Sequence, residues 1–343
     1  MKIKKFLVGI GLCLLFSIIG LFILEIVVHV LFPQLIPSAE NQRIYYQYDE
    51  LLGWSHIPFK EGKFKGKDFS VNVHINSHGL RDREYAVERI PGKNRILMLG
   101  DSIGWGVGVE SRNRIDEIIE SKYQNLEIIN ASISGYGTDQ QYLYLKHRGI
   151  EFKPDLVVLM FSLTDIANNS YKKQYRLEKP VFRFKNDKLK LQNVPVPTKG
   201  FWSQINTYIL EKTYFFRKAL LFFKLSKSKA LEFQNLKQES YENGFNITKA
   251  LLLEISNFTI ENNIDFIIVF IPLAGPENNK TINQLVEFAE SSNIDYLLLP
   301  EVFRDKEAEI YFKHNKHWNS YAHEIAAKEL ELVLKKENYL NID

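Results

Sequence analysis

The stretch Arg95-Ile96-Leu97-Met98-Leu99-Gly100-Asp101-Ser102-Ile103 is a short apolar run that ends in Gly-Asp-Ser. A run of this length, with Gly92 before it and glycines after it, is typical of a buried strand in a parallel sheet. Ser102 then follows the carboxyl end of the strand, where open α/β sheets bind their ligands. The serine is therefore either a nucleophile presented at a sharp turn or a residue that caps the next helix.

The chain beyond Arg95 repeats this pattern, because short apolar runs alternate with segments of helical length. The apolar runs predict strands over residues 95–99, 126–130, 156–161, 266–271 and 296–299. The segments between and after them predict helices over residues 110–123, 139–149, 247–262, 281–291 and 319–336. Strands that alternate with helices indicate a parallel sheet covered on both faces.

Lysines at positions 2, 4 and 5 precede an uncharged apolar run over residues 6–24, which continues less purely to Phe32. A helix needs about 20 apolar residues to span a bilayer. Lysines at its start orient the N-terminus toward the cytoplasm. A cleaved signal peptide has a shorter apolar region and a small-residue cleavage site, for which Pro37-Ser38-Ala39 is a poor candidate. We expect residues 1–32 to form a cytoplasmic N-terminus and a single-pass anchor in the cell (inner) membrane, with the later chain in the periplasm or outside the cell.

Composition bounds the remaining possibilities. The 343 residues allow one large domain with appendages or two small domains. A net charge of +3, with no basic block, does not indicate a nucleic-acid partner. The single cysteine, Cys13, leaves no disulfide framework and no cysteine-based metal site.

Two segments lie outside the alternating pattern. Residues 33–90 are predicted to link the anchor to the α/β domain, which we assign to residues 91–338, and alternating valines at 71 and 73 predict an edge strand or hairpin there. Residues 171–240 are predicted to form an insertion or a cap. Within them, residues 208–225 are rich in Tyr, Phe and Leu. They fit a cap over the site, a helix on the membrane surface, or a helix packed on the sheet.

Four predicted loops leave the carboxyl ends of strands, and each carries a residue that could take part in catalysis. The first loop holds Ser102, the second Gly135, the third Thr164 and the last His317. Loops at one end of a parallel sheet converge, so we expect these positions to form one site.

These loops together resemble the SGNH/GDSL hydrolase family, and specifically its membrane-anchored extracytoplasmic members. The resemblance covers most of residues 45–336. It rests on four blocks in the family's order: Gly100-Asp101-Ser102-Ile103, Asn130 to Gln141, Pro154 to Asp165, and His317-Trp318-Asn319. The segment Asn76 to Asp82 also looks like the one that precedes the domain in such members.

The resemblance implies a three-layer, flavodoxin-like domain with a five-stranded parallel sheet. It implies that Ser102 is the nucleophile and His317 its general base, and that the Gly135 N–H joins the oxyanion hole. Thr164 stands where the family has an asparagine donor. The family's acid lies two or three residues before the histidine, and here those positions hold Asn315 and His314. An amide oxygen can accept the imidazole N–H and fix its tautomer, so we assign that role to Asn315. We expect the Ser102 N–H to complete the oxyanion hole, and Asp101 and Asp165 to support the site.

The predicted function is acyl transfer at an ester. Water as acceptor makes the chain an esterase, and a sugar hydroxyl makes it an O-acyl (acetyl) transferase. Its location and the family resemblance favour an ester-bearing small molecule, a cell-envelope glycan or a lipid, and suggest envelope-polysaccharide machinery as a partner. We expect no cofactor. A metal is disfavoured because His314, His317 and His323 lack the spacing of a helical zinc motif.

Two other classes of protein remain for comparison. Because Thr164 and Asn315 replace stronger catalytic groups, a weak or inactive SGNH-fold module that binds a glycan or a partner protein is the alternative. The first loop has neither a Gly-x-Gly-x-x-Gly pattern nor a P-loop lysine, which argues against a nucleotide-binding domain.

Overall fold

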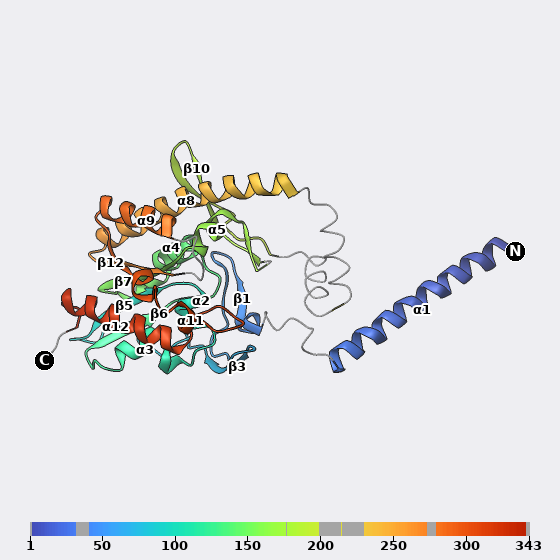
Figure 1. Ribbon diagram of the computed structural model, residues 1–343, viewed down its shortest axis with the longest axis horizontal. Helices are drawn as coiled ribbons and strands as arrows, with labels where there is room; N and C mark the ends of the chain where they lie inside the picture. The colour runs from blue at the N-terminus through green and yellow to red at the C-terminus, as the bar shows by residue number, and fades with distance from the viewer. Residues whose placement is uncertain are drawn as a thin grey trace. The chain divides into compact units, whose positions relative to one another are not determined.

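The computed structural model describes residues 2–31, 41–175, 177–198, 214, 230–272 and 279–340 (Figure 1). The chain divides into two compact units, Met1–Glu40 with Lys199–Asn235, and Asn41–Thr198 with Leu236–Asp343. In the first unit, α1 (Lys2–Leu31) is a single helix, and its segment Val8–Val28 is long and apolar enough to cross a membrane. Apart from Tyr214, the segment 208–225 discussed above lies outside the described residues.

The second unit is built on the predicted five-stranded parallel sheet. Its strands are β5 (Asn94–Leu99), β6 (Leu126–Asn130), β7 (Leu156–Ser162), β12 (Asp265–Ile271) and β13 (Asp295–Leu298). They lie in the order β13-β12-β7-β5-β6, all parallel. The chain runs from β5 outward to β6 and then crosses back to β7, which is the flavodoxin-like order. The parallel sheet predicted from the apolar runs is therefore confirmed.

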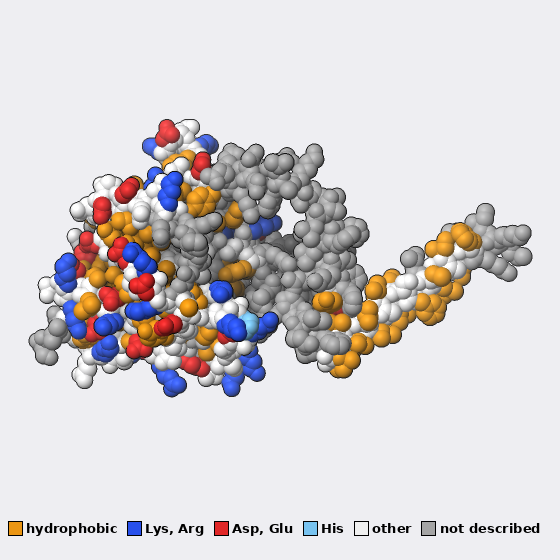
Figure 2. All heavy atoms as spheres, viewed as in Figure 1, with side chains coloured by type: hydrophobic (Ala, Val, Ile, Leu, Met, Phe, Trp, Pro, Cys, Tyr) orange, Lys and Arg blue, Asp and Glu red, His pale blue; other side chains and the backbone are white. Residues whose placement is uncertain are grey.

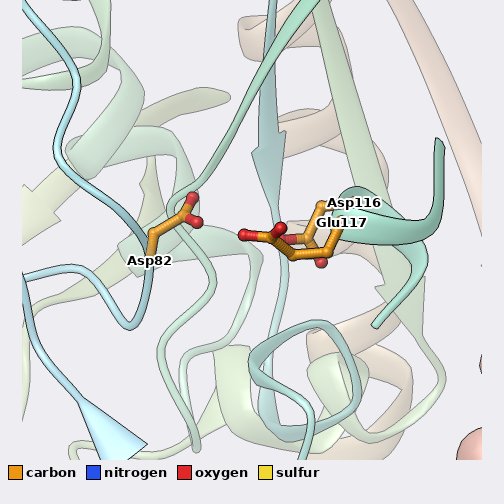
Figure 3. A group of neighbouring side chains, drawn as sticks. All are labelled: Asp82, Asp116 and Glu117. Atoms are coloured by element: carbon orange, nitrogen blue, oxygen red, sulfur yellow. The ribbon is translucent and has the colours of Figure 1, made fainter. Parts of the chain in front are cut away.

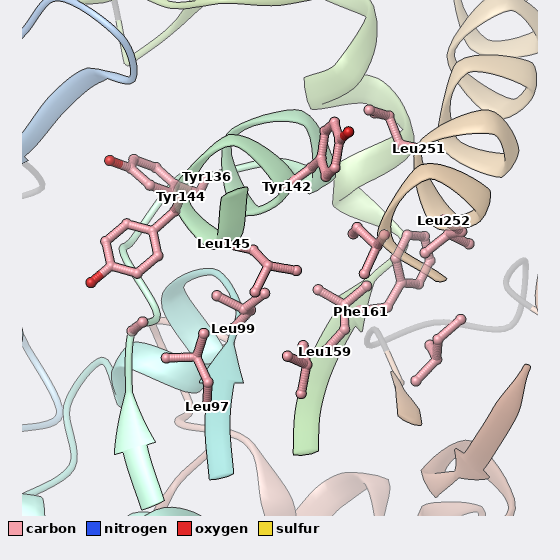
Figure 4. Packing of buried hydrophobic residues seen from close by; sticks show 14 of the residues in the cluster. Leu97, Leu99, Tyr136, Tyr142, Tyr144, Leu145, Leu159, Phe161, Leu251 and Leu252 are labelled. Atoms are coloured by element: carbon pink, nitrogen blue, oxygen red, sulfur yellow. The ribbon is translucent and has the colours of Figure 1, made fainter. Parts of the chain in front are cut away.

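The strands are apolar throughout because both faces of the sheet are covered. Successive side chains alternate between the two faces. One face packs against α4 (Thr138–His147), α8 (Ala230–Glu261) and α9 (Asn279–Ser291), where Leu97 and Leu99 of β5 meet Leu145 of α4 (Figure 4). The other face carries Ile96 and Met98, and packs against α3 (Ile115–Glu120) and α12 (Ser320–Lys336). This is the three-layer arrangement.

Four predicted elements described here differ from the structure at their ends. The helix predicted over residues 110–123 is shorter, because Arg114 is extended and separates the 3-10 turn η3 (Ser111–Asn113) from α3. The helix predicted from residue 139 is α4, followed by the 3-10 turn η4 (Gly149–Phe152), and the helix predicted from residue 247 already begins at Ala230. Leu299, predicted to end the last strand, begins α10 (Leu299–Phe303), which has a proline in its first turn.

Two antiparallel hairpins precede the sheet. After the 3-10 turn η2 (Asn41–Tyr45), they are β1 (Tyr46–Asp49) with β2 (Gly53–His56), and β3 (Glu61–Lys65) with β4 (Ser70–His74). The alternating valines thus lie in a hairpin that is separate from the main sheet. Val71 and Val73 of β4 bury their side chains with Trp105, just beyond Ser102. This contact attaches the hairpin to the turn that carries the serine.

Two more hairpins occupy the described start of the predicted insertion. They are β8 (Lys173–Gln174) with β9 (Leu177–Glu178), and β10 (Val181–Lys185) with β11 (Lys188–Gln192). They follow α5 (Thr164–Ser170), and the short helix α11 (Glu307–Ile310) lies before the last loop. On the face drawn in Figure 2, the second unit carries charged side chains of both signs, whereas the described side chains of α1 are hydrophobic along much of its length.

Candidate active site

Ser102 lies at the turn between β5 and α2 (Ser102–Trp105), directly beyond the end of the strand. Asp101 caps this short helix, because its Oδ1 accepts a hydrogen bond from the Ile103 N–H at 2.8 Å. Gly104 leaves room for the neighbouring loop, since a Cβ at this position would lie 2.3 Å from Ser132 Oγ. Ser102 itself is 8% exposed, so its surroundings exclude most of the bulk water.

His317 reaches Ser102 from the loop before α12. Its Nε2 lies 2.9 Å from Ser102 Oγ, although 215 positions separate the two residues. Its Nδ1 is hydrogen-bonded to Oδ1 of Asn315. When the Nδ1–H donates to the amide oxygen, Nε2 is left as an acceptor for the proton of the serine hydroxyl. This is the geometry of a nucleophile beside its base.

The surroundings of His317 favour the neutral imidazole. Burial lowers the pKa of His317 below its usual value, and a contact with the backbone of Asn315 raises it by less. Helix α12 begins three residues later, with Asn319 as its cap, and the positive end of a helix also disfavours a charged imidazole. A neutral ring is the form that can accept a proton.

The loop after β6 is tied to the serine turn by hydrogen bonds. Asn130 Nδ2 donates to the Gly104 carbonyl at 2.9 Å, and the Ile133 N–H donates to the Gly100 carbonyl at 3.2 Å. Gly135, further along this loop, has a φ of 86°, and a Cβ on it would lie 2.1 Å from Tyr175 Cε2. Both the backbone conformation and the tyrosine ring therefore require glycine at this position.

Thr164 is held beside the serine turn through its hydroxyl. Its Oγ1 donates to Asp101 Oδ2 at 3.3 Å and lies 2.9 Å from Ser162 Oγ. A hydroxyl has one hydrogen to donate, and the carboxylate of Asp101 takes it here. Thr164 thus supports the residue that caps the serine helix.

Comparison with known proteins places this arrangement in a family. Residues 96–330 match the family described as GDSL-like Lipase/Acylhydrolase, and this span contains all four of the predicted site loops. The chain belongs to the GDSL/SGNH hydrolase family. The family indicates an enzyme that hydrolyses esters, in agreement with the resemblance drawn from the sequence.

Several solved structures are similar to this GDSL family member. A GDSL-like lipase from Bacteroides thetaiotaomicron is 11% identical, covering 73% of this chain and 91% of its own, with a TM-score of 0.43. A psychrotrophic esterase from Pseudoalteromonas sp. is 14% identical, covering 71% and 98%, with a TM-score of 0.43. A lipase/acylhydrolase from Enterococcus faecalis is 14% identical, covering 71% and 96%, with a TM-score of 0.41. No curated protein matches the chain.

Two buried carboxyl groups lie behind the serine in this GDSL family member. Burial raises the pKa of Asp101 to about 6. Burial also raises the pKa of Asp165 well above its usual range, and the nearby Asp101 adds to the effect. Asp165 accepts a hydrogen bond from Thr138 Oγ1 at 3.2 Å, which connects α5 to the start of α4. The pair is arranged to hold loops together rather than to meet a substrate.

A separate group of carboxylates, Asp82, Asp116 and Glu117, lies on the α3 side of the sheet (Figure 3). The negative charge of this group is offset by Arg114, whose guanidinium donates hydrogen bonds to both carboxylate oxygens of Asp116, at 3.1 and 2.5 Å. Asp82 Oδ2 accepts the N–H of Asn130 at 2.8 Å, where the second site loop begins. These contacts explain the cluster as a structural network that fixes the entry to that loop.

Sequence reasoning missed three residues that surround the site: Asp68, Tyr175 and Lys179. Tyr175 covers Gly135, and Lys179 is fully buried in an ion pair with Asp139. Asp68, in the turn of the β3–β4 hairpin, contacts the loop that carries His317. Asp68 and Tyr175 lie in the turns of hairpins outside the α/β pattern, and Lys179 directly follows β9. No motif spacing connects these residues to the four loops.

Proposed function

We propose that this GDSL family member is a serine-dependent enzyme of ester chemistry that uses Ser102 as nucleophile and His317 as general base. The observation that carries the proposal is the 2.9 Å contact between Ser102 Oγ and His317 Nε2. A hydroxyl at this distance from a neutral imidazole can lose its proton as it attacks.

The steps follow from these positions. Ser102 Oγ bonds to the acyl carbon while its proton passes to His317 Nε2, and the carbonyl electrons move onto oxygen. The N–H groups of Ser102 and Gly135 hold this oxyanion, and Thr164 joins them as a third donor when its hydroxyl turns from Asp101 toward the oxyanion. One such donor is worth about 3–4 kcal/mol in a well-studied protease. The bond to the leaving alcohol then breaks, and His317 returns the proton to that alcohol. Water deprotonated by His317 releases the acyl group and restores the serine.

The acceptor and the location complete the proposal. A sugar hydroxyl in place of water makes the same acyl-enzyme a transferase. We propose that residues 1–32 anchor the chain in the cell membrane, that residues 33–90 lead to the catalytic domain outside the cytoplasm, and that residues 171–240 form an insertion or cap over it. A cell-envelope glycan or lipid ester is then the accessible substrate class. The exposed apolar side chains of α1 support the anchor.

A fluorophosphonate probe tests the nucleophile directly, because it bonds covalently to a serine that a neighbouring base activates. We expect the full-length protein in detergent to be labelled, and peptide mass spectrometry to place the label on Ser102. Labelling of another serine, or none at all, contradicts the proposed mechanism.

One pair of observations favours a second candidate, a weak or inactive module that binds a glycan or a partner protein. Asn315 supplies no negative charge to stabilise an imidazolium, and the Thr164 hydroxyl is already bonded to Asp101. Absence of both labelling and ester turnover, together with retained glycan binding, supports this candidate.

The pH dependence of the reaction is predicted by the state of His317. Because burial lowers the pKa of His317, the neutral base persists to lower pH than for an exposed histidine. We expect kcat/KM for a small aryl ester to rise with pH and level off, with its midpoint below about 6.5, the ordinary histidine value. A midpoint above that value contradicts the assignment of His317 as the titrating base.

Replacing Asn315 with aspartate is expected to raise turnover. The carboxylate keeps the acceptor for His317 Nδ1 and adds a charge that stabilises the imidazolium. The loss of that charge costs a serine protease about ten-thousandfold, so we expect a gain in kcat of roughly tenfold or more. The midpoint of the pH profile rises at the same time, because a nearby negative charge favours the protonated ring.

Asn315→Ala is the matched control, because it removes the acceptor without adding charge, and its kcat should fall. A lower rate for Asn315→Asp than for the wild type shows instead that the amide is suited to a task other than orienting the base.

A further inference from the structure

The loop that carries His317 is exposed, and a residue from another part of the chain forms hydrogen bonds to it. Its residues from Lys313 to Lys316 are all exposed, and Lys316 has a φ of 61°. Within the loop, the Phe312 N–H donates to the His317 carbonyl at 2.9 Å and the Lys316 N–H to the Phe312 carbonyl at 3.2 Å. These local bonds close the loop on itself but do not fix its place over Ser102.

Asp68 reaches this loop from the turn between β3 and β4. Its Oδ2 accepts the backbone N–H of His314 at 2.7 Å, and its Oδ1 lies 2.5 Å from His314 Nδ1. The backbone of Asn315 also faces the same carboxylate and helps to lower the pKa of Asp68. One side chain therefore binds His314 and faces Asn315, the residue that holds the His317 ring.

An aromatic contact also joins the turn of the β3–β4 hairpin to the loop that carries His317. The rings of Phe69 and Phe312 lie 5.3 Å apart, one from the hairpin turn and one from the loop. Both rings lie close over Gly108, where a Cβ would come within 2.6 Å of Phe69 and 2.7 Å of Phe312. The hairpin turn is in this way fixed to the segment that follows Ser102.

We propose that Asp68 is a positioning residue for the general base, which it holds through His314 and Asn315; this inference rests on the function proposed above. Position 314 is one of the two positions where the resemblance places the family's acid, and here a histidine stands there. The β3–β4 hairpin supplies a carboxylate to that histidine from elsewhere in the chain. Asp68 fixes the position of the loop. It contacts His314 and Asn315 rather than the His317 ring.

The charge state of Asp68 agrees with this role. The hydrogen bond from His314 lowers the pKa of Asp68, and the backbone contacts from the loop act in the same direction. The carboxylate is therefore ionised at neutral pH, and as an acceptor-only group it can receive every N–H that the loop presents.

The same hairpin offers a matched control. Glu61 Oε1 and His74 Nδ1 form another carboxylate–histidine pair at 2.8 Å, with 72% and 51% of the side chains exposed. These two residues pair at the open end of the hairpin, whereas Asp68 lies in its turn. An exposed pair of this kind contributes little to stability. Glu61→Ala therefore removes the same chemistry from the same hairpin without touching the loop.

The test measures kcat and KM for a small aryl ester, together with amide hydrogen exchange in the full-length protein. We expect Asp68→Ala to lower kcat about ten- to a hundredfold, since a base displaced by about 1 Å costs that much, with little change in KM. Exchange at the amide of His314 should become faster, because the variant removes its acceptor. Glu61→Ala should change neither quantity.

Two further variants separate positioning from simple stability. Asp68→Asn keeps an oxygen that accepts the backbone N–H groups, so it should recover most of the lost kcat. His314→Ala keeps the backbone contacts and should lose less than Asp68→Ala. An unchanged kcat and unchanged exchange in Asp68→Ala overturn the inference, as does an equal loss in Glu61→Ala. The exchange result stands whether or not the wild type turns over an ester, so failure of the proposed function is recognised separately, by unlabelled Ser102.

Discussion

Ser102→Ala is expected to lower ester turnover about a million-fold, the cost of removing the nucleophile in a well-studied serine protease. No other group in the proposed mechanism forms the acyl-enzyme, so the residual rate should come from binding and the oxyanion donors alone. The measurement is kcat/KM for an aryl ester, together with fluorophosphonate labelling. Labelling should vanish and turnover should fall to the residual rate. The temperature of unfolding should stay close to that of the wild type, because the serine hydroxyl is small and is replaced by hydrogen.

Ser121→Ala is the control for this experiment. Ser121 is exposed at the end of α3, and its hydroxyl bonds the Ile118 carbonyl of its own helix. It should therefore react and label like the wild type. More than a few per cent of wild-type turnover in Ser102→Ala shows that the chemistry lies elsewhere.

His317→Ala is expected to cost nearly as much as the loss of the serine. A serine hydroxyl without its base is a poor nucleophile, and in a well-studied protease the two single losses are similar in size. The variant should also slow the reaction of Ser102 with the fluorophosphonate, which reports on activation without any need for turnover. The double variant Ser102→Ala, His317→Ala should be no worse than either alone, because the two residues work as a unit.

His147→Ala provides the matched histidine control. His147 is exposed near the end of α4, away from the four site loops in sequence, and its loss should leave the rate unchanged. Full activity in His317→Ala means that another base deprotonates Ser102. In that case His317 has no part in the mechanism.

The sheet could be predicted from the sequence because its signal is local. Each of the five strands is a short apolar run, and each observed boundary lies within one residue of the predicted one. The strand order came instead from the family resemblance. Helix ends were less predictable, because they depend on tertiary contacts. Arg114 leaves the helical conformation to bond Asp116, and nothing in the spacing of residues 110–123 indicates this.

The candidate site was predictable to the extent that topology determines it. Ser102 and His317 follow the ends of strands in one parallel sheet, so their meeting was expected, and they lie within hydrogen-bond distance. Their roles remain a proposal. The contacts that surround them were not foreseen, because Asp68 and Tyr175 belong to hairpins whose docking depends on side-chain packing. For the same reason, the hydrogen bond from the Thr164 hydroxyl to Asp101 could not be predicted from the order of the residues.

The buried ion pair between Lys179 and Asp139 limits how the neighbouring hairpins can move. Neither side chain has any exposed surface, and Lys179 also donates to the Asn168 carbonyl at 3.1 Å. Swinging this part of the chain outward would separate the two charges, and breaking such a pair costs about 3–5 kcal/mol. A reaction cycle that moved these hairpins outward would require this free energy at every turnover. Substrate exchange should therefore proceed with these hairpins in place.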